Sequence, residues 1–258
     1  MLYFSNEHSK DNLDKSFIEL LDKFEKIKSM GYVKSINKLK NGSGFTLEHY
    51  LGSTSGDFCI PDFEDIEIKS IRKYKEAEIG LFSSAPDGKY ASATQWLSQN
   101  YGYPIKGFSG QRGLSGNITG NKENKIGLFY YFKLKVDYSM QKIILEIYNK
   151  DHKLINNDVY WDFDSIEDKL NRKLSKLAVV ESNKKKNGED YYYHYNNIKL
   201  YKSKSFDVFL NLIELGIISL GMKTGVYKSG KYIGKFHDHG CTFRIQKNNL
   251  ERLFDRVY

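Results

Sequence analysis

The most chemically suggestive part of the sequence is the stretch PDFEDIEIKS, which places two acidic side chains and a lysine close together. Asp62 follows a proline, and Glu67 and Lys69 stand two residues apart where isoleucine alternates with charged residues. That alternation is typical of a β-strand, in which side chains two positions apart point to the same face. The sequence therefore predicts a carboxylate and an ammonium on one face of a strand, with a second carboxylate just before it.

Such a group of side chains is suited to hydrolysing a phosphodiester with the help of a divalent cation. The cation would offset the charge that builds on the phosphate and lower the pKa of an attacking water. Asp62 and Glu67 would each supply an oxygen ligand and the main-chain carbonyl of Ile68 a third, which suffices for Mg²⁺ because this ion keeps several waters. Lys69 would hold and activate the water while offsetting phosphate charge. The alternative is an ordinary strand with a Glu and a Lys on one face, a pattern that is common by chance.

A second stretch, HDHG, also combines side chains that do chemistry, namely His237, Asp238 and His239, with Arg244 shortly after them. One interpretation is a metal site, either zinc or the metal of a His-metal finger nuclease, but zinc needs three or four convergent ligands and only Cys241 adds a thiol nearby. Another is base recognition, with Arg244 bidentate to guanine, Asp238 accepting from cytosine N4 and the histidines donating to guanine acceptors. The third is a turn of surface histidines that have local partners.

Basic and aromatic residues precede this second stretch. They are Lys223, Tyr227, Lys228, Lys231 and Lys235. Beside a base-reading loop, lysines and a tyrosine hydroxyl would contact phosphates, which sets the register on a duplex without selecting sequence. A solvated basic face is the alternative. The lysine run 184–186, flanked by Asn and Gly, is interpreted as part of a solvated turn over 184–190.

Hydrophobic periodicity predicts the elements that carry these residues. Residues 13–30 have apolar side chains at three- and four-residue spacing, which predicts an amphipathic helix that Gly31 ends. Further helices are expected over 45–51, 165–176, 206–216 and 250–254. Strands are expected over 65–70, 77–82, 128–136, 142–148, 177–181 and 191–195, with strand and loop from residue 217. Residues 84–124 are expected to consist mostly of loops. Mixed elements without strict βαβ alternation favour an α+β or irregular α/β fold.

Bulk composition agrees with a polyanionic partner without requiring one. The 258 residues carry 40 Lys plus Arg against 32 Asp plus Glu, a net charge of +8. Cys59 and Cys241 are the only cysteines, too few for a disulfide framework or a cysteine-rich zinc site. The N-terminus lacks the pattern of a signal peptide, and no apolar run is long enough to span a membrane. We therefore expect a soluble cytoplasmic protein with no membrane partner.

Six segments in matching order make the chain similar to the MvaI/BcnI restriction endonucleases, relatives of the MutH mismatch-repair nickase. The segments are GFTLEHYLG (44–52), PDFEDIEIKS (61–70), VYWDFDSIEDKL (159–170), AVVES (178–182), YYHYN (192–196) and YKSGKYIGKFHDHGCTFRI (227–245). They are distributed over most of the chain, between residues 44 and 245. Residues 84–124 depart most from the family's pattern.

The resemblance implies a PD-(D/E)xK fold, in which helices flank a mixed central sheet and a second lobe recognises DNA. It assigns Asp62 and Glu67 as metal ligands and Lys69 as the catalytic lysine. Glu48 matches an acidic residue that supports the site from the neighbouring helix, the alternative being a solvated surface carboxylate. The expected lobes are 1–200 for catalysis and 201–258 for recognition.

The resemblance also implies how such an enzyme acts. We expect a Mg²⁺-dependent type II restriction endonuclease that binds double-stranded DNA as a monomer and nicks each strand in turn. The family's usual target is a pentanucleotide of the CC-x-GG kind, and a cognate DNA methyltransferase is expected in the same system. A MutH-like repair nickase is one alternative, and a DNA-binding reader without catalysis is another.

Overall fold

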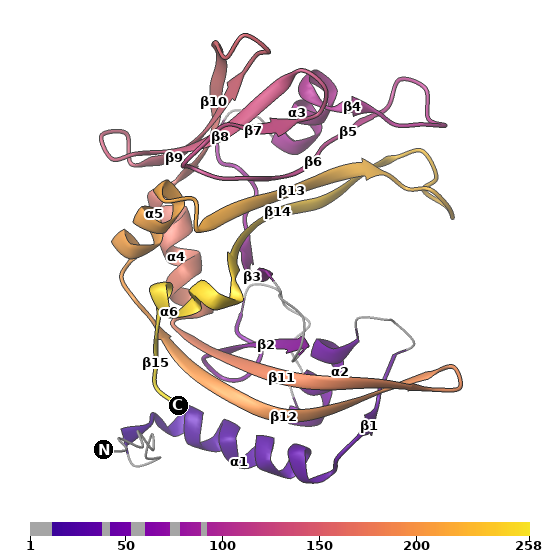
Figure 1. Cartoon of the computed structure of the whole chain (residues 1–258), viewed down its shortest axis with the longest axis vertical. Helices are drawn as coiled ribbons and strands as arrows, with labels where there is room; N and C mark the ends of the chain where they lie inside the picture. Colours follow the sequence, from indigo (N-terminus) through magenta and orange to yellow (C-terminus); the bar gives the residue numbers. More distant parts are fainter. Residues whose placement is uncertain (1–11, 38–41, 53–59, 73–77, 89–91) are drawn as a thin grey trace, which may run out of the picture. The chain divides into compact units, whose positions relative to one another are not determined.

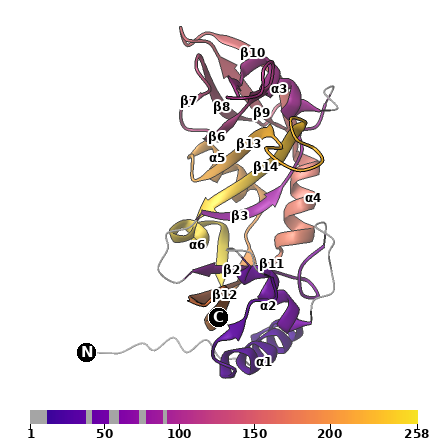
Figure 2. The ribbon, with the colours of Figure 1, turned by 90° about the vertical axis from the view of Figure 1, so that its right-hand side faces the viewer.

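The computed structural model describes residues 12–37, 42–52, 60–72, 78–88 and 92–258 (Figures 1 and 2). The chain folds into two compact units. Unit 1 comprises residues 1–77, 170–204 and 250–258, and unit 2 comprises residues 78–169 and 205–249. Helix α4 (Phe163–Leu174) begins in unit 2 and ends in unit 1. The units therefore do not follow the two continuous ranges expected from the sequence.

Unit 1 is built on a mixed sheet of five strands with the order β1-β12-β11-β2 and β15 paired to β12. The strands are β1 (Val33–Lys34), β2 (Ile66–Arg72), β11 (Lys176–Asn187), β12 (Asp190–Ser203) and β15 (Phe254–Arg256). β2 runs parallel to β11, and the other pairs are antiparallel. The strand that carries Glu67 and Lys69 is therefore the last strand of this sheet at one side.

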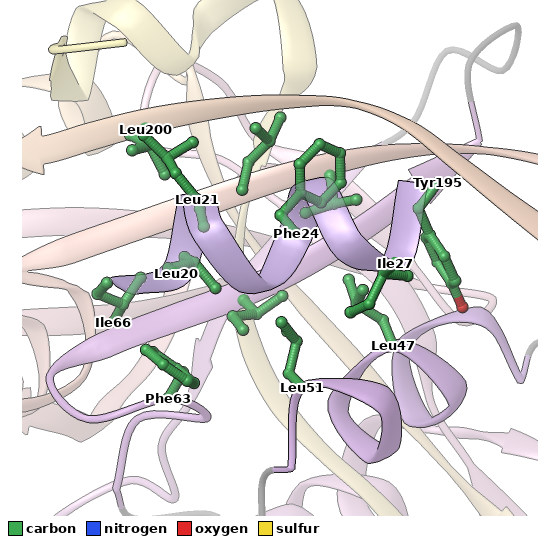
Figure 3. Close-up of a cluster of buried hydrophobic side chains, with 14 of the residues drawn as sticks. Leu20, Leu21, Phe24, Ile27, Leu47, Leu51, Phe63, Ile66, Tyr195 and Leu200 are labelled. Carbon is green, nitrogen blue, oxygen red and sulfur yellow. The ribbon is translucent and has the colours of Figure 1, made fainter. Parts of the chain in front are cut away.

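Helices α1 (Lys15–Ser29) and α2 (Ser43–Leu51) form the core of unit 1 together with one face of this sheet (Figure 3). The apolar stripe predicted for α1 is buried as expected, and Gly31 follows the helix with a φ of +68°. Ile66 and Ile68 of β2 point into the same core. Since neighbouring strand residues point to opposite faces, the core fixes the direction of Glu67 and Lys69.

One local prediction in unit 1 is wrong. Residues 184–187 do not form a turn but continue β11, which pairs with β12 as far as Asn187 and Asp190. The turn is shorter, with Gly188 at a φ of +59°. Lysine side chains lie over tyrosine rings along this hairpin, with Lys184 Nζ 3.8 Å from the ring centre of Tyr191. Cation–π contacts of this kind let a polar run extend as a strand.

Unit 2 holds two four-stranded antiparallel sheets. The first has the order β3-β14-β13-β6, from β3 (Glu78–Ser83), β14 (Phe236–Gln246), β13 (Ile218–Val226) and β6 (Ser115–Ile118). The second has the order β10-β9-β8-β7, from β10 (Leu154–Asp162), β9 (Lys142–Tyr148), β8 (Tyr130–Asp137) and β7 (Asn124–Ile126). Helix α5 (Phe206–Glu214) also belongs to unit 2, and η2 (Lys247–Asn249) leads into α6 (Leu250–Leu253) of unit 1.

The region 84–124 is more regular than predicted. It contains helix α3 (Ala93–Tyr101), the paired strands β4 (Tyr103–Pro104) and β5 (Arg112–Gly113), and β6. Helix α3 is short and polar, so it lacks the apolar stripe that would reveal it in the sequence. Tertiary contacts anchor it instead: Leu97 is fully buried, and Ser98 Oγ lies 2.6 Å from Thr224 Oγ1 of β13.

The remaining expected helices and strands occur, most of them with ends shifted by a few residues, which confirms a mixed α+β fold. The strand expected over 191–195 is longer than predicted, because β12 continues to Ser203. Within the described residues, no helix is long and apolar enough to cross a membrane. Cys241 is a buried free thiol, whereas Cys59 lies outside the described residues.

Candidate active site

The predicted pair on β2 meets on the face of the sheet opposite the core of unit 1. Lys69 Nζ donates a hydrogen bond to Glu67 Oε1. A second lysine, Lys173 in the last turn of α4, places its Nζ 3.6 Å from the same oxygen. Glu67 is 1% exposed, whereas Lys69 and Lys173 are 27% and 17% exposed. A buried carboxylate is thus bordered by two ammonium groups that still reach solvent.

Asp62 joins this group from the segment just before β2. Its Oδ2 accepts a hydrogen bond of 2.8 Å from the main-chain N–H of Ile68. In a strand, the N–H and C=O of one residue point to the same side. The Ile68 carbonyl is therefore directed to the side on which Asp62 lies, away from the ladder with β11. Asp62 and the Ile68 carbonyl thus lie along the free edge of β2, the strand that carries Glu67 on its face opposite the core.

The carboxyl of Glu48 in α2 interacts electrostatically with Asp62, Lys69 and Lys173. Burial raises the pKa of the Glu48 carboxyl, and the negative charge of Asp62 raises it further, while Lys69 and Lys173 act in the opposite direction. The half-buried position and these interactions set Glu48 apart from a freely solvated surface carboxylate. Burial also raises the pKa of Glu67, with Lys69 opposing the shift and Asp62 adding to it.

One buried oxygen of the site has no partner among the described residues. Glu67 Oε2 is inaccessible to solvent and accepts no hydrogen bond from this part of the chain. Leaving a charged oxygen unsatisfied in this way is unfavourable, and a cation beside Asp62 and Glu67 would remove the penalty. Across the described ranges, no three His, Cys, Asp or Glu side chains converge as a ready ligand set. A site with two carboxylates and a carbonyl still fits Mg²⁺, which keeps most of its waters.

In unit 2, the predicted HDHG residues lie on β14, where a β-bulge interrupts its pairing with β13. The ring of His237 stacks on the ring of Tyr227, with 4.0 Å between the ring centres and 10° between the ring planes. The ring centre of His239 lies 4.1 Å from that of His237. Burial lowers the pKa of the His239 ring, and neighbouring His237 and Lys223 lower it further, while Asp238 acts in the opposite direction. The structure therefore gathers Lys223, Tyr227 and both histidines into one cluster.

Asp238 is fixed by its neighbours within unit 2. Its Oδ2 accepts a hydrogen bond of 2.5 Å from Thr94 Oγ1 of α3, and its Oδ1 accepts one of 2.7 Å from the Gly240 N–H. Carboxylate oxygens have further lone pairs, so Asp238 retains acceptor capacity.

The other predicted DNA-binding residues of unit 2 differ in their surroundings. Lys228 is exposed. Lys231 and Lys235 border the ring of Tyr232. Arg244 lies farther along β14 than Asp238: Arg244 pairs with Ser219 of β13, whereas Asp238 pairs with Thr224. The Nη1 of Arg244 is 3.6 Å from Glu78 Oε2.

Sequence reasoning missed three residues that touch the predicted ones. They are Lys173 beside Glu67, Thr94 beside Asp238 and Glu78 beside Arg244. Each comes from an element distant in sequence from its partner. The basic helix over 165–176 was the only local signal, and it did not single out Lys173.

Comparison with known proteins places the chain in one family of restriction endonucleases. The profile of the MvaI/BcnI restriction endonuclease family matches residues 21–254. A solved complex of the restriction endonuclease MvaI with its cognate DNA substrate is similar at a TM-score of 0.85 and 30% identity, covering 95% of this chain and 100% of that chain. MvaI in the absence of DNA gives a TM-score of 0.61 and 29% identity over 95% and 97% of the two chains. A search of curated proteins gives no match.

The mixed fold and these matches define a type II restriction endonuclease, a site-specific DNA endonuclease. More narrowly, the chain belongs to the MvaI/BcnI restriction endonuclease family, whose profile covers most of its length.

Proposed function

We propose that this enzyme cleaves double-stranded DNA at a short GC-containing site of the CC-x-GG kind, with Mg²⁺ held by Asp62, Glu67 and the Ile68 carbonyl. The observation that carries the proposal is the buried Glu67 Oε2, which has no partner among the described residues although two lysines border its carboxylate. An isolated strand pair of Glu and Lys would have no reason to keep such an oxygen buried. A metal-binding carboxylate does, because its cation satisfies that oxygen.

The bound cation would lower the pKa of the attacking water and offset charge on the phosphate. Lys69 has three N–H donors, of which one is directed to Glu67. The other two can orient the water and contact a phosphate oxygen. Glu67 thus positions the Lys69 ammonium, and Lys173 keeps Glu67 Oε1 paired with positive charge. Glu48 supports the site by adding an acceptor near Asp62.

Recognition is proposed to lie in unit 2. Asp238, held by Thr94, would accept from cytosine N4, while His237, His239 and Arg244 would donate to guanine. The stacking of His237 on Tyr227 favours this role over metal binding, because it fixes the ring plane without bringing a third ligand to it. Lys223, Tyr227 and Lys228 would contact phosphates.

We further propose that the enzyme acts as a monomer that nicks each strand in turn, in the cytoplasm, with a cognate DNA methyltransferase in the same system. Catalysis would be carried by unit 1, most of which falls in the lobe expected over 1–200. Recognition would be carried by unit 2, which includes residues 205–249 of the lobe expected over 201–258.

Incubation of the pure protein with supercoiled plasmid and Mg²⁺ tests the proposal. We expect linear fragments whose sequenced ends share one GC-containing site, and cleavage by Lys69→Ala that is slower by about 10² or more. Open circles alone would favour a repair nickase. Binding of duplex DNA without cleavage under any divalent cation would favour a reader without catalysis and would overturn the proposed mechanism.

A further inference from the structure

A single carboxylate, Glu78 at the start of β3, contacts polar side chains from two other strands of its sheet. Its Oε2 lies 3.6 Å from Arg244 Nη1 of β14. Its Oε1 accepts hydrogen bonds from Asn117 Nδ2 of β6 at 3.1 Å and from Gln246 Nε2 at 3.3 Å. Glu78 is 28% exposed, so these contacts are partly shielded from water.

Gly221 of β13 forms the surface on which the Arg244 side chain lies. A Cβ built on Gly221 would come within 2.5 Å of Arg244 Nε and 2.7 Å of its Cζ. The φ of Gly221 is not positive, so its backbone conformation does not require glycine. The space above its Cα is what the arginine uses.

The two contacts act on different parts of the same side chain. Glu78 holds the end of the guanidinium, and Gly221 lets the Nε–Cζ plane approach the sheet. A bidentate contact to guanine O6 and N7 requires the guanidinium to present two N–H groups in one plane. Arginine otherwise has many rotamers, and ordering them on binding opposes association.

We propose that Glu78 and Gly221 position Arg244 for base reading, which makes Glu78 a specificity-determining residue of the enzyme. This inference rests on the proposed function, because it takes Arg244 as a reader of guanine. Glu78 is a positioning residue: its carboxylate acts through Arg244. Asn117 and Gln246 in turn donate hydrogen bonds that hold the Glu78 carboxylate in place.

The test measures kcat/KM on the cognate duplex and on duplexes that carry single base-pair substitutions. The variants are Glu78→Ala, Glu78→Gln, Gly221→Ala and Arg244→Lys, and the double variant Glu78→Ala with Arg244→Lys. Glu123→Gln is the matched control, because Glu123 also pairs with a basic side chain, His152, in unit 2 and is 27% exposed.

We expect Arg244→Lys to lose about tenfold or more of the discrimination at one base pair. Glu78→Ala and Gly221→Ala should lose discrimination at that same base pair, Glu78→Gln by less, and Glu123→Gln at none. The double variant should discriminate no worse than Arg244→Lys alone. Gly221→Ala leaves the contacts of Glu78 with Asn117 and Gln246 in place, so it tests positioning even if Glu78→Ala fails to fold.

The inference is overturned if Glu78→Gln and Gly221→Ala discriminate like the wild type, or lose activity equally on all duplexes. A double variant whose losses add also overturns it. These results are separable from failure of the proposed function, since that failure would appear as a wild-type chain that cuts no duplex and would remove both proposals.

Discussion

The proposed function gives Asp62 two separable tasks, which the pair of variants Asp62→Asn and Asp62→Ala distinguishes. The carboxylate accepts the Ile68 N–H at 2.8 Å, and we propose that it also binds the cation. Asparagine keeps an oxygen that can accept the N–H but loses the charge. Alanine loses both, and it leaves the main-chain N–H of Ile68 without its acceptor.

A hydrogen bond to a charged group contributes about 1.5–3 kcal/mol in general. Because Asp62 is half-buried and water can replace part of the bond, we expect Asp62→Ala to lower the free energy of unfolding by about 1–2 kcal/mol. Asp62→Asn should stay within about 0.5 kcal/mol of the wild type, since it also removes repulsion with Glu67 and Glu48. Both variants should be inactive.

The assay is urea unfolding without divalent cations, followed by thermal unfolding with and without Mg²⁺ and by plasmid cleavage. A loss of about 1–2 kcal/mol corresponds to roughly 2–8 °C in Tm for a chain of this size. Addition of Mg²⁺ should raise the Tm of the wild type and of neither variant. The reasoning is refuted if Asp62→Asn is as unstable as Asp62→Ala, or if Asp62→Asn still cleaves DNA.

Three further predictions concern Glu67, the two lysines beside it and the basic residues of unit 2. Because the folded-state pKa of Glu67 lies above its ordinary value of 4.5, the stability that this group contributes is fully present below pH 4.5 and is lost as pH rises through the raised pKa. In the metal-free protein, the unfolding free energy of the wild type should therefore fall relative to that of Glu67→Gln as pH rises above 4.5. With Mg²⁺ this difference should no longer depend on pH in that range. A difference that does not change with pH without metal would contradict the burial argument. In single-turnover cleavage, Lys69→Ala should lose about 10²–10⁴ in rate and Lys173→Ala clearly less, so equal losses would show that Lys69 is not the distinct catalytic lysine. The double variant Lys223→Gln with Lys228→Gln should reduce the slope of log Kd against log salt concentration by about 1 for each phosphate that is no longer neutralised. Its preference among DNA sites should stay the same, and an altered preference would contradict a role in phosphate binding.

Local patterns were sufficient where one strand or helix carries the whole signal. The stripe from Phe17 to Ile27 and the alternation around Glu67 depend on periods of 3.6 and 2, which the sequence displays directly. The two faces of β2 could thus be predicted before any tertiary contact was known. The same holds for the proposed metal-ligand set, because Asp62, Glu67 and Ile68 lie within seven consecutive residues.

Prediction failed where contacts between distant segments decide the outcome. Lysines 184–186 have the polarity of a turn, but Tyr191 on β12 and Tyr32 just before β1 give their side chains rings to cover, so the hairpin extends. Helix α3 depends on Ser98 meeting Thr224, 126 positions later. Lys173 and Glu78 could not be found for the same reason, since each is defined by a partner on another element.

We propose that Asp62, Glu67 and the Ile68 carbonyl bind one divalent cation together. Anomalous diffraction from a crystal of the full chain with its cognate duplex and Mn²⁺ would locate that cation. We predict a peak within coordination distance of oxygens from all three residues, Glu67 Oε2 among them. A fully occupied peak elsewhere, with Glu67 Oε2 still unpartnered beside Lys69, would contradict the claim.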